Sequence, residues 1–154
     1  SCSGTVDDNA LIDTSSVGEH SFTVNAADNV GNPASRTTTY IVSYGIVAMY
    51  DQAKTHQSGS TIPVKLQLVD HSKRNMSAAA ITVTPLEVVK LSDDTSGVAA
   101  PPSSAVADSN FRYDTTLGGY IYNLRTTGLS TGTYELHFRA ANDPTVQTVN
   151  FQIR

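Results

Sequence analysis

The sequence has few of the residues that build disulfides, metal clusters and basic surfaces. Its 154 residues include one cysteine and no tryptophan, and only 16% are charged. One cysteine cannot form an internal disulfide or a cysteine pair with metal-ligand spacing. Ten Lys and Arg, scattered along the chain, stand against 14 Asp and Glu, so no nucleic-acid partner is expected. No apolar run approaches the roughly 18 residues of a membrane span, so no membrane insertion is expected either.

A sustained helical period is also missing, and short alternating runs take its place. The stretch Gly59 to Leu68 alternates apolar and polar side chains, as a half-buried strand does. Pro63 lacks an amide donor, which predicts an edge, a strand start or a bulge at that position. Four apolar residues of this central strand are expected to share one face: Ile62, Val64, Leu66 and Leu68.

The rest of the second part of the chain repeats this pattern. Residues 80–84 and 86–91 predict two strands, or one strand broken at Pro85, and residues 93–110 predict a loop. Paired glycines at 118 and 119 predict a hairpin. The two last strands have the clearest inward residues: Tyr134, Leu136 and Phe138, then Val149, Phe151 and Ile153. Seven or eight short strands over residues 45–154 predict an all-β, immunoglobulin-like β-sandwich of antiparallel sheets.

Residues 1–44 carry fewer strands. The runs His20 to Ala26 and Thr38 to Val42 flank a turn rich in Asp, Asn and Gly, which predicts a hairpin. Two or three strands make only half a sandwich. They are expected to leave an open sheet edge and an uncovered apolar face.

This first segment resembles the second half of the bacterial immunoglobulin-like and hyalin-type repeats of surface proteins. The resemblance implies a partial immunoglobulin-like repeat over residues 1–44 whose first strands are missing. The residues that carry the resemblance are Gly18, His20, Phe22, Thr23, Val24, Asp28, Gly31, Asn32 and Tyr40.

Residues 45–154 resemble the PxKF-type module found at the C-terminal ends of large secreted bacterial proteins. Pro63, Val64 and Lys65 match the motif, and Leu66 stands where the family has Phe. The resemblance implies a tail module without a catalytic role, on a secreted or cell-surface, extracellular protein. Further matching stretches are 59–62, 113–114, 119–122, 132–134 and 149–151.

The opening Ser-Cys-Ser-Gly, without an initiating Met or a signal sequence, predicts a fragment of a longer polypeptide. Cys2 then has two interpretations. It pairs with an upstream cysteine of the parent protein, or it is an incidental exposed thiol.

Calcium is the cofactor that the sequence permits. Two turns are rich in oxygen ligands, and hard oxygen ligands in the loops of stacked sandwiches can hold a calcium ion. The alternative is plain turn chemistry, since Asp and Asn are common in turns. The candidate calcium ligands are Asp7, Asp8, Asp28 and Asn32.

Two further patterns invite a functional interpretation. Residues 128–132 fit the Gly-x-Ser-x-Gly pattern of a nucleophile elbow around Ser130. That chemistry needs a helix after the serine, whereas a strand is expected here, so a turn is favoured. The seven tyrosines could include a platform for stacking sugar rings, although core packing is the simpler role.

The sequence therefore predicts a non-catalytic extracellular structural or spacer module whose partners are other domains of the parent protein. One alternative is a cell-adhesion module that binds polysaccharide or a surface partner. The other is a self-assembling subunit joined to neighbouring copies by strand addition through residues 1–44.

Overall fold

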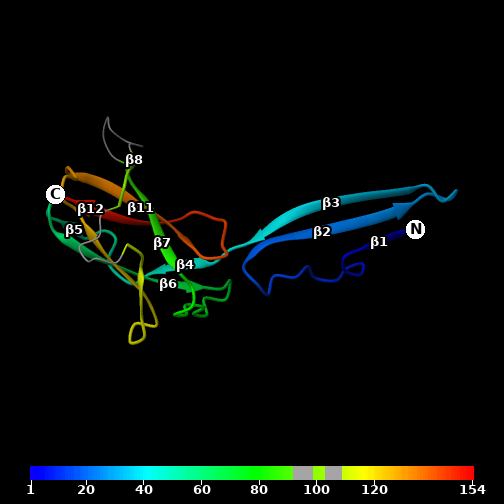
Figure 1. Cartoon of the computed structure of the whole chain (residues 1–154), viewed down its shortest axis with the longest axis horizontal. Helices are drawn as coiled ribbons and strands as arrows, with labels where there is room; N and C mark the ends of the chain where they lie inside the picture. Colours follow the sequence, from blue (N-terminus) through cyan, green and yellow to red (C-terminus); the bar gives the residue numbers. More distant parts are fainter. Residues whose placement is uncertain (92–98, 103–108) are drawn as a thin grey trace. The chain divides into compact units, whose positions relative to one another are not determined.

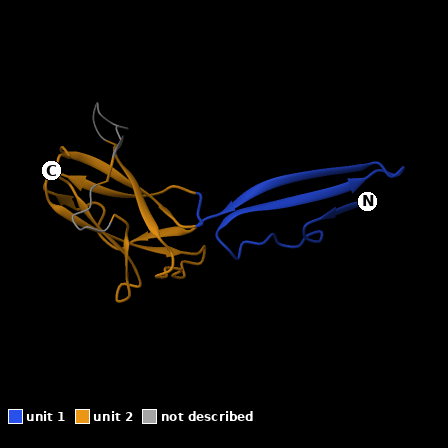
Figure 2. Ribbon diagram, viewed as in Figure 1, with its two compact units in different colours: residues 1–43, 142–144 blue, residues 44–141, 145–154 orange. Residues whose placement is uncertain are grey.

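The computed structural model describes residues 1–91, 99–102 and 109–154, and Figure 1 traces its strands. Within these ranges every regular element is a β-strand, so the all-β prediction is confirmed. No described segment forms a helix of the length and hydropathy needed to span a membrane. Figure 2 colours the two compact units: unit 1 is Ser1–Ser43 with Asn142–Pro144, and unit 2 is Tyr44–Ala141 with Thr145–Arg154. That these units correspond to the predicted repeat and module stays a prediction.

Unit 1 is built on a long hairpin. Strand β2 (Gly18–Ala27) pairs antiparallel with β3 (Pro33–Val42) over its whole length, and β1 (Cys2–Gly4) pairs with the other edge of β2. The predicted turn joins β2 to β3. No residue of these three strands is fully buried, because no second sheet of unit 1 packs against this one within the described residues. Only loop residues such as Val6 and Ile12 lie near Phe22.

Unit 2 contains two sheets. One has the strand order β4-β6-β10-β9 and the other the order β5-β12-β11-β7-β8. Pairing is antiparallel throughout both sheets except between β12 and β5, which run parallel. The strands are β4 (Gly45–Ala48), β5 (Thr55–His56), β6 (Thr61–Val69), β7 (Val83–Lys90), β8 (Ala99–Ala100), β9 (Arg112–Asp114), β10 (Gly119–Arg125), β11 (Gly132–Ala140) and β12 (Gln147–Ile153).

This strand order is that of an immunoglobulin-like sandwich. In such a domain, strands A, B, E and D form one sheet and C, F and G the other. Strands β4, β6, β10 and β9 take the places of A, B, E and D, while β7, β11 and β12 take those of C, F and G. The short strands β5 and β8 extend the second sheet at its edges. The immunoglobulin-like prediction is therefore correct for unit 2.

The inner faces of both sheets share one core. The four apolar residues expected on the central strand β6 are all buried, as are the inward residues expected on β11 and β12. Phe111 connects the sheets: its ring lies 5.0 Å from that of Tyr122 on β10 and 5.4 Å from that of Phe138 on β11. Alternation with period two predicts these faces correctly because each strand is buried on one side only.

Two positions needed special backbone geometry. Pro63 lies near the start of β6, outside the segment Leu66–Val69 that pairs with β4, so its missing amide costs no bond on that side. In the β9–β10 hairpin Gly118 has the positive φ expected, 59°. Gly119 is needed for a different reason, because a Cβ there would clash with the carbonyl of Leu66.

Strand β7 differs most from the prediction. Residues 80–82 are not part of it, and it continues past Pro85 as one strand rather than two. Leu86 is an extra residue in the pairing with β11, a β-bulge that reverses which residues face inward. The predicted loop 93–110 lies largely outside the described residues, but Ala99–Ala100 within it forms β8 against β7.

Candidate functional site

The candidate calcium ligands fall into two groups in unit 1. Asp7 and Asp8 follow β1 and line an open hollow of about 510 Å³, together with apolar residues that include Phe22. Asp28 and Asn32 lie in the β2–β3 turn and do not line that hollow. The structure thus places Asp7 near Asp8 and Asp28 near Asn32, but the four residues do not line the same hollow.

The Asp28 carboxylate is occupied by its own turn. Its Oδ1 accepts hydrogen bonds from the backbone N–H groups of Val30 and Asn32, both at 2.9 Å, and its Oδ2 accepts one from the Asn32 side-chain amide at 2.7 Å. These bonds favour the charged carboxylate, and the backbone N–H of Asn32 contributes most to lowering the pKa of Asp28. This is the geometry of a turn closed by an aspartate.

No three His, Cys, Asp or Glu side chains are grouped to hold a metal ion anywhere in the described ranges 1–91, 99–102 and 109–154. Calcium also binds amide and backbone carbonyl oxygens, such as those of Asn32. Calcium binding at Asp7, Asp8, Asp28 and Asn32 stays a prediction.

The Gly-x-Ser-x-Gly stretch forms the turn between β10 and β11. Tyr134, at the start of β11, donates a hydrogen bond from its hydroxyl to the Ser130 carbonyl at 2.9 Å. A tyrosine in this strand that bonds back to the chain a few residues upstream is the tyrosine corner of immunoglobulin-like domains. The Gly-x-Ser-x-Gly stretch is therefore a turn, and the Tyr134 hydroxyl holds it in place.

Lys90 completes this corner. The bulge in β7 turns its side chain inward, where it is 8% exposed. Its Nζ donates a hydrogen bond to Ser130 Oγ at 2.8 Å and lies 5.9 Å from the centre of the Tyr134 ring. This contact was not predicted, because Lys90 lies beyond the bulge that reverses the inward and outward positions of β7.

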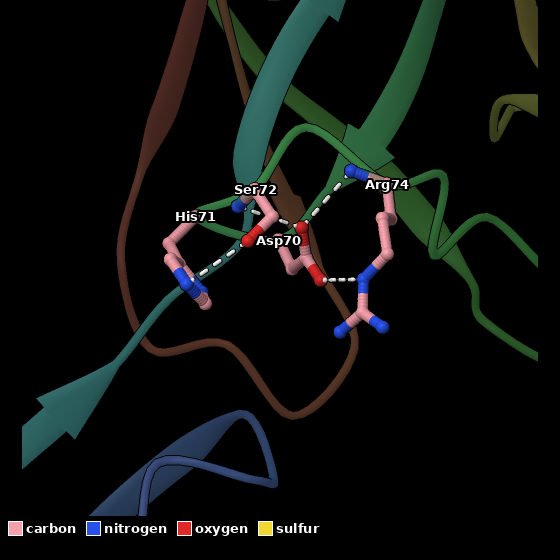
Figure 3. A network of polar contacts seen from close by, with 4 residues as sticks. All are labelled: Asp70, His71, Ser72 and Arg74. Carbon is pink, nitrogen blue, oxygen red and sulfur yellow. Dashed lines mark hydrogen bonds and ion pairs between the residues drawn. The ribbon is translucent and has the colours of Figure 1, made fainter.

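The loop after β6 is held together by Asp70 (Figure 3). Asp70 Oδ1 accepts from the backbone N–H groups of Ser72 and Arg74, and Oδ2 accepts from Arg74 Nε at 2.7 Å. The backbone bond from Arg74 is the main cause that lowers the pKa of Asp70. His71 Nε2 lies 3.0 Å from the Ser72 hydroxyl. The Arg74 side chain is 78% exposed, so this network orders a surface loop.

A second polar cluster, on the outer face of the second sheet, also went unpredicted. His137 Nδ1 lies 2.9 Å from Glu87 Oε1, and its Nε2 lies 3.0 Å from Glu135 Oε2. Both ring nitrogens can donate only when the imidazole is protonated. The outward positions of Glu135 and His137 were visible in the alternation, but Glu87 reaches them only through the shifted register of β7.

None of the seven tyrosines is exposed. Tyr40 stacks on His20 with ring centres 5.2 Å apart, and Tyr50 donates a hydrogen bond to the Asn150 carbonyl at 2.7 Å. A stacking platform for sugars needs exposed ring faces. The half-buried tyrosines are Tyr40, Tyr44, Tyr50 and Tyr113, and the buried ones are Tyr120, Tyr122 and Tyr134.

The side of the β2–β3 hairpin that carries Phe22 and Val24 has a second open hollow. Every second residue of β2 and β3 points to this side, and together they line a hollow of about 430 Å³. The opposite side is more polar, with several Ser and Thr beside Glu19 and Asn25, and also carries Ile41. We use the name front face for Phe22, Val24, Ala26, Ala34, Arg36 and Thr38.

No protein-family model matches the sequence, and no curated protein matches it. Among solved structures the chain is similar to a chimeric titin Z1Z2-Z1Z2 tandem functionalised with a GRGDS exogenous peptide from fibronectin. The identity is 14% and the TM-score 0.31, and the alignment covers 88% of this chain and 65% of that chain. This similarity is too weak to assign a fold, so the immunoglobulin-like assignment rests on the strand order of unit 2.

Proposed function

We propose that this chain is a non-catalytic structural or spacer module of a larger secreted or cell-surface protein, with other domains of that protein as its partners. The resemblances to hyalin-type repeats and to PxKF-type modules suggest a bacterial, extracellular setting. The observation that carries the proposal is how β5, the second strand of unit 2, is joined to β12, its last strand.

Strands β5 and β12 run side by side in the same direction, with Thr55 opposite Gln152 and His56 opposite Ile153. Two side chains of the segment before β5 extend this contact. Tyr50 Oη donates to the Asn150 carbonyl at 2.7 Å, and the Asn150 N–H donates to Gln52 Oε1 at 2.6 Å. We call this pair of side chains the Tyr50–Gln52 latch.

Tension applied to the two ends of unit 2 first loads β4, which is paired with β6, and beyond it pulls β5 toward its N-terminal end and β12 toward its C-terminal end. Because the strands are parallel neighbours, their bonds are loaded in shear and must yield together. Antiparallel neighbours pulled from one end would separate one bond at a time. A spacer that carries force between domains needs such a junction.

A non-catalytic role is supported by the surroundings of Ser130, the serine of the Gly-x-Ser-x-Gly stretch. Ser130 sits in the turn that the tyrosine corner closes, its carbonyl accepts the Tyr134 hydroxyl, and a strand follows it. No helix dipole or oxyanion turn follows the serine, as a nucleophile elbow requires. A fluorophosphonate probe is expected to leave Ser130 unlabelled, and labelling there would contradict this part of the proposal.

Single-molecule pulling tests the mechanical role. The whole chain, with handles on both ends, is stretched beside a variant carrying Tyr50→Phe and Gln52→Ala. We expect unit 2 to unfold in one step, and at a lower force in the variant. Met49→Ala is the matched control, since that side chain belongs to the same segment and is 40% exposed. Equal forces for the chain and the latch variant would contradict the proposal.

Self-assembly by strand addition through residues 1–44 is the second candidate. It is favoured by unit 1, where a ten-residue strand stands at a sheet edge and no second sheet of the described chain covers the front face. Binding of polysaccharide or of an adhesion partner stays untested. It has less support, because no tyrosine is exposed, and retention of the chain on glycan gels would revive it.

A further inference from the structure

The outer edge of β3 offers a regular row of backbone groups. In the β2–β3 hairpin the Asp28 N–H bonds to the Asn32 carbonyl, and the register continues from there in steps of two residues. Even-numbered residues of β3 therefore direct their N–H and C=O groups toward β2. On the far side of β2, Ala27 bonds to Ser1, just before β1, and Thr23 bonds to Thr5, just after it, as odd positions should.

The odd-numbered residues of β3 consequently point their backbone groups away from the sheet. Within the described part of the chain, no residue bonds to these groups. Pro33 also lies at this edge but has no N–H to offer. The residues with both groups directed outward are Ser35, Thr37, Thr39 and Ile41.

The other sheet edges of the described chain are closed or short. The outer edge of β12 is taken by β5 and by the Tyr50–Gln52 latch. Strands β1, β4, β5, β8 and β9, which also stand at edges, have four residues or fewer. In a second copy of this chain, the open strand that is long enough to match β3 is β3 itself.

We propose that β3 pairs antiparallel with β3 of a second copy across a two-fold axis at Thr38, giving a continuous six-stranded sheet. This inference rests on the self-assembly candidate above and names its strand and register. A two-fold pairing of one edge with itself is closed, so it ends at a dimer and does not continue into fibres.

The chemistry of β3 selects this register. Pairing about Thr38 sets Ser35 against Ile41 of the partner subunit and Thr37 against Thr39 of the partner subunit. All four outward N–H groups are then bonded, and Pro33 lies beyond the ladder. Arg36, which carries the only charge on β3, faces the partner's Tyr40, a cation–π pair. Moving the two-fold axis two residues along β3, from Thr38 to Arg36, would bring the two arginines into direct opposition.

Disulfide trapping tests the register in the full chain. Cys2, which is free and exposed, is first changed to Ser. Thr38→Cys on this background places the two thiols in a non-hydrogen-bonded antiparallel pair, with Cα atoms about 4.5 Å apart, within reach of a disulfide. Ala34→Cys is the matched control on the same face, since its two copies would lie about 26 Å apart at about 3.3 Å per residue.

A proline substitution tests the hydrogen bonds. Thr39→Pro removes one outward N–H but leaves the β2 ladder intact, as proline at an edge position does. Thr39→Ala loses the same hydroxyl and keeps the N–H. We expect light scattering to show a dimer for the parent chain and for Thr39→Ala, and a monomer for Thr39→Pro. NMR signals of the β2 amides verify that the hairpin remains folded in each variant.

The outcomes are distinct. Rapid cross-linking of Thr38→Cys, none of Ala34→Cys, and loss of the dimer in Thr39→Pro support the inference. A dimer that cross-links through Thr37→Cys but not Thr38→Cys overturns the register and leaves the self-assembly candidate standing. A monomer at every concentration overturns both, and leaves the spacer proposal as it was.

Discussion

Replacing Tyr134 by Phe removes one hydroxyl from the tyrosine corner and leaves the ring in place. The ring is 4% exposed and stacks on Phe151 with centres 5.3 Å apart and planes 12° apart, so packing should survive. The hydroxyl donates to the Ser130 carbonyl at 2.9 Å. A net hydrogen bond contributes about 0.5–1.5 kcal/mol, and a buried acceptor left without a partner costs about 1–3 kcal/mol.

Ser130 is exposed, so water can reach its carbonyl once the tyrosine hydroxyl is gone. The cost should therefore stay near that of the bond itself, about 1–1.5 kcal/mol of the free energy of unfolding. Urea unfolding followed by far-ultraviolet circular dichroism measures this loss as a lower midpoint at an unchanged slope.

Tyr122→Phe is the matched control. That ring is also buried, 2% exposed, and its hydroxyl makes no hydrogen bond within the described residues. It should change the free energy of unfolding by less than about 0.5 kcal/mol. If Tyr134→Phe were no more destabilising than Tyr122→Phe, the corner would not hold the turn between β10 and β11, and the reasoning above would fail.

Three further predictions concern pH and calcium. Burial raises the pKa of Tyr50, Tyr120 and Tyr122 above the ordinary 10.0. The free energy of unfolding should therefore hold below about pH 10 and fall above it, as the tyrosines of the unfolded chain ionise. Tyr50→Phe should make this fall smaller, as measured by urea midpoints from pH 8 upward. Backbone N–H groups lower the pKa of Asp28, Asp70 and Asp114 below 3.8, so their stabilisation should be present above that pH and disappear as pH drops below it. The parent should therefore melt higher than Asp70→Asn at neutral pH and lose that difference in acid, and a difference that persists unchanged well below pH 3.8 would contradict the second. If calcium binds at the turns of unit 1, it should raise the melting temperature of the parent but not of a variant with Asp7→Asn and Asp8→Asn, and equal melting temperatures with and without calcium would rule this site out.

Alternation was enough to predict much of the sandwich. Residues on β6, β11 and β12 face the core as expected, because one-sided burial ties the strand face to sequence parity. The same rule fails on β7 at Leu86, where the inserted residue reverses parity without any change in composition. Lys90 faces the core and Glu87 the outer side for this reason, so simple alternation does not predict their contacts with Ser130 and His137.

The candidate sites show the same division. Asp28 and Asn32 were recognised as turn residues, since a short polar turn between two strands is local in sequence. The parallel pairing of β5 with β12 was not predicted, because two residues carry too little pattern to signal a strand. Long-range partners such as Tyr50 and Asn150 depend on the complete sheet order, which no local pattern contains.

The Tyr50–Gln52 latch has a consequence for how this chain is made. Tyr50 and Asn150 are 100 residues apart in sequence, and β5 finds its partner in the last strand of the fold. During synthesis on the ribosome, the early segment must therefore wait, unpaired, until nearly all of the chain has been translated. Such distant contacts slow folding, and the waiting segment is exposed to wrong partners meanwhile. The segment is polar, with Asp51, Gln52, Lys54 and Ser58, and polar residues favour its solubility until β12 has been synthesised.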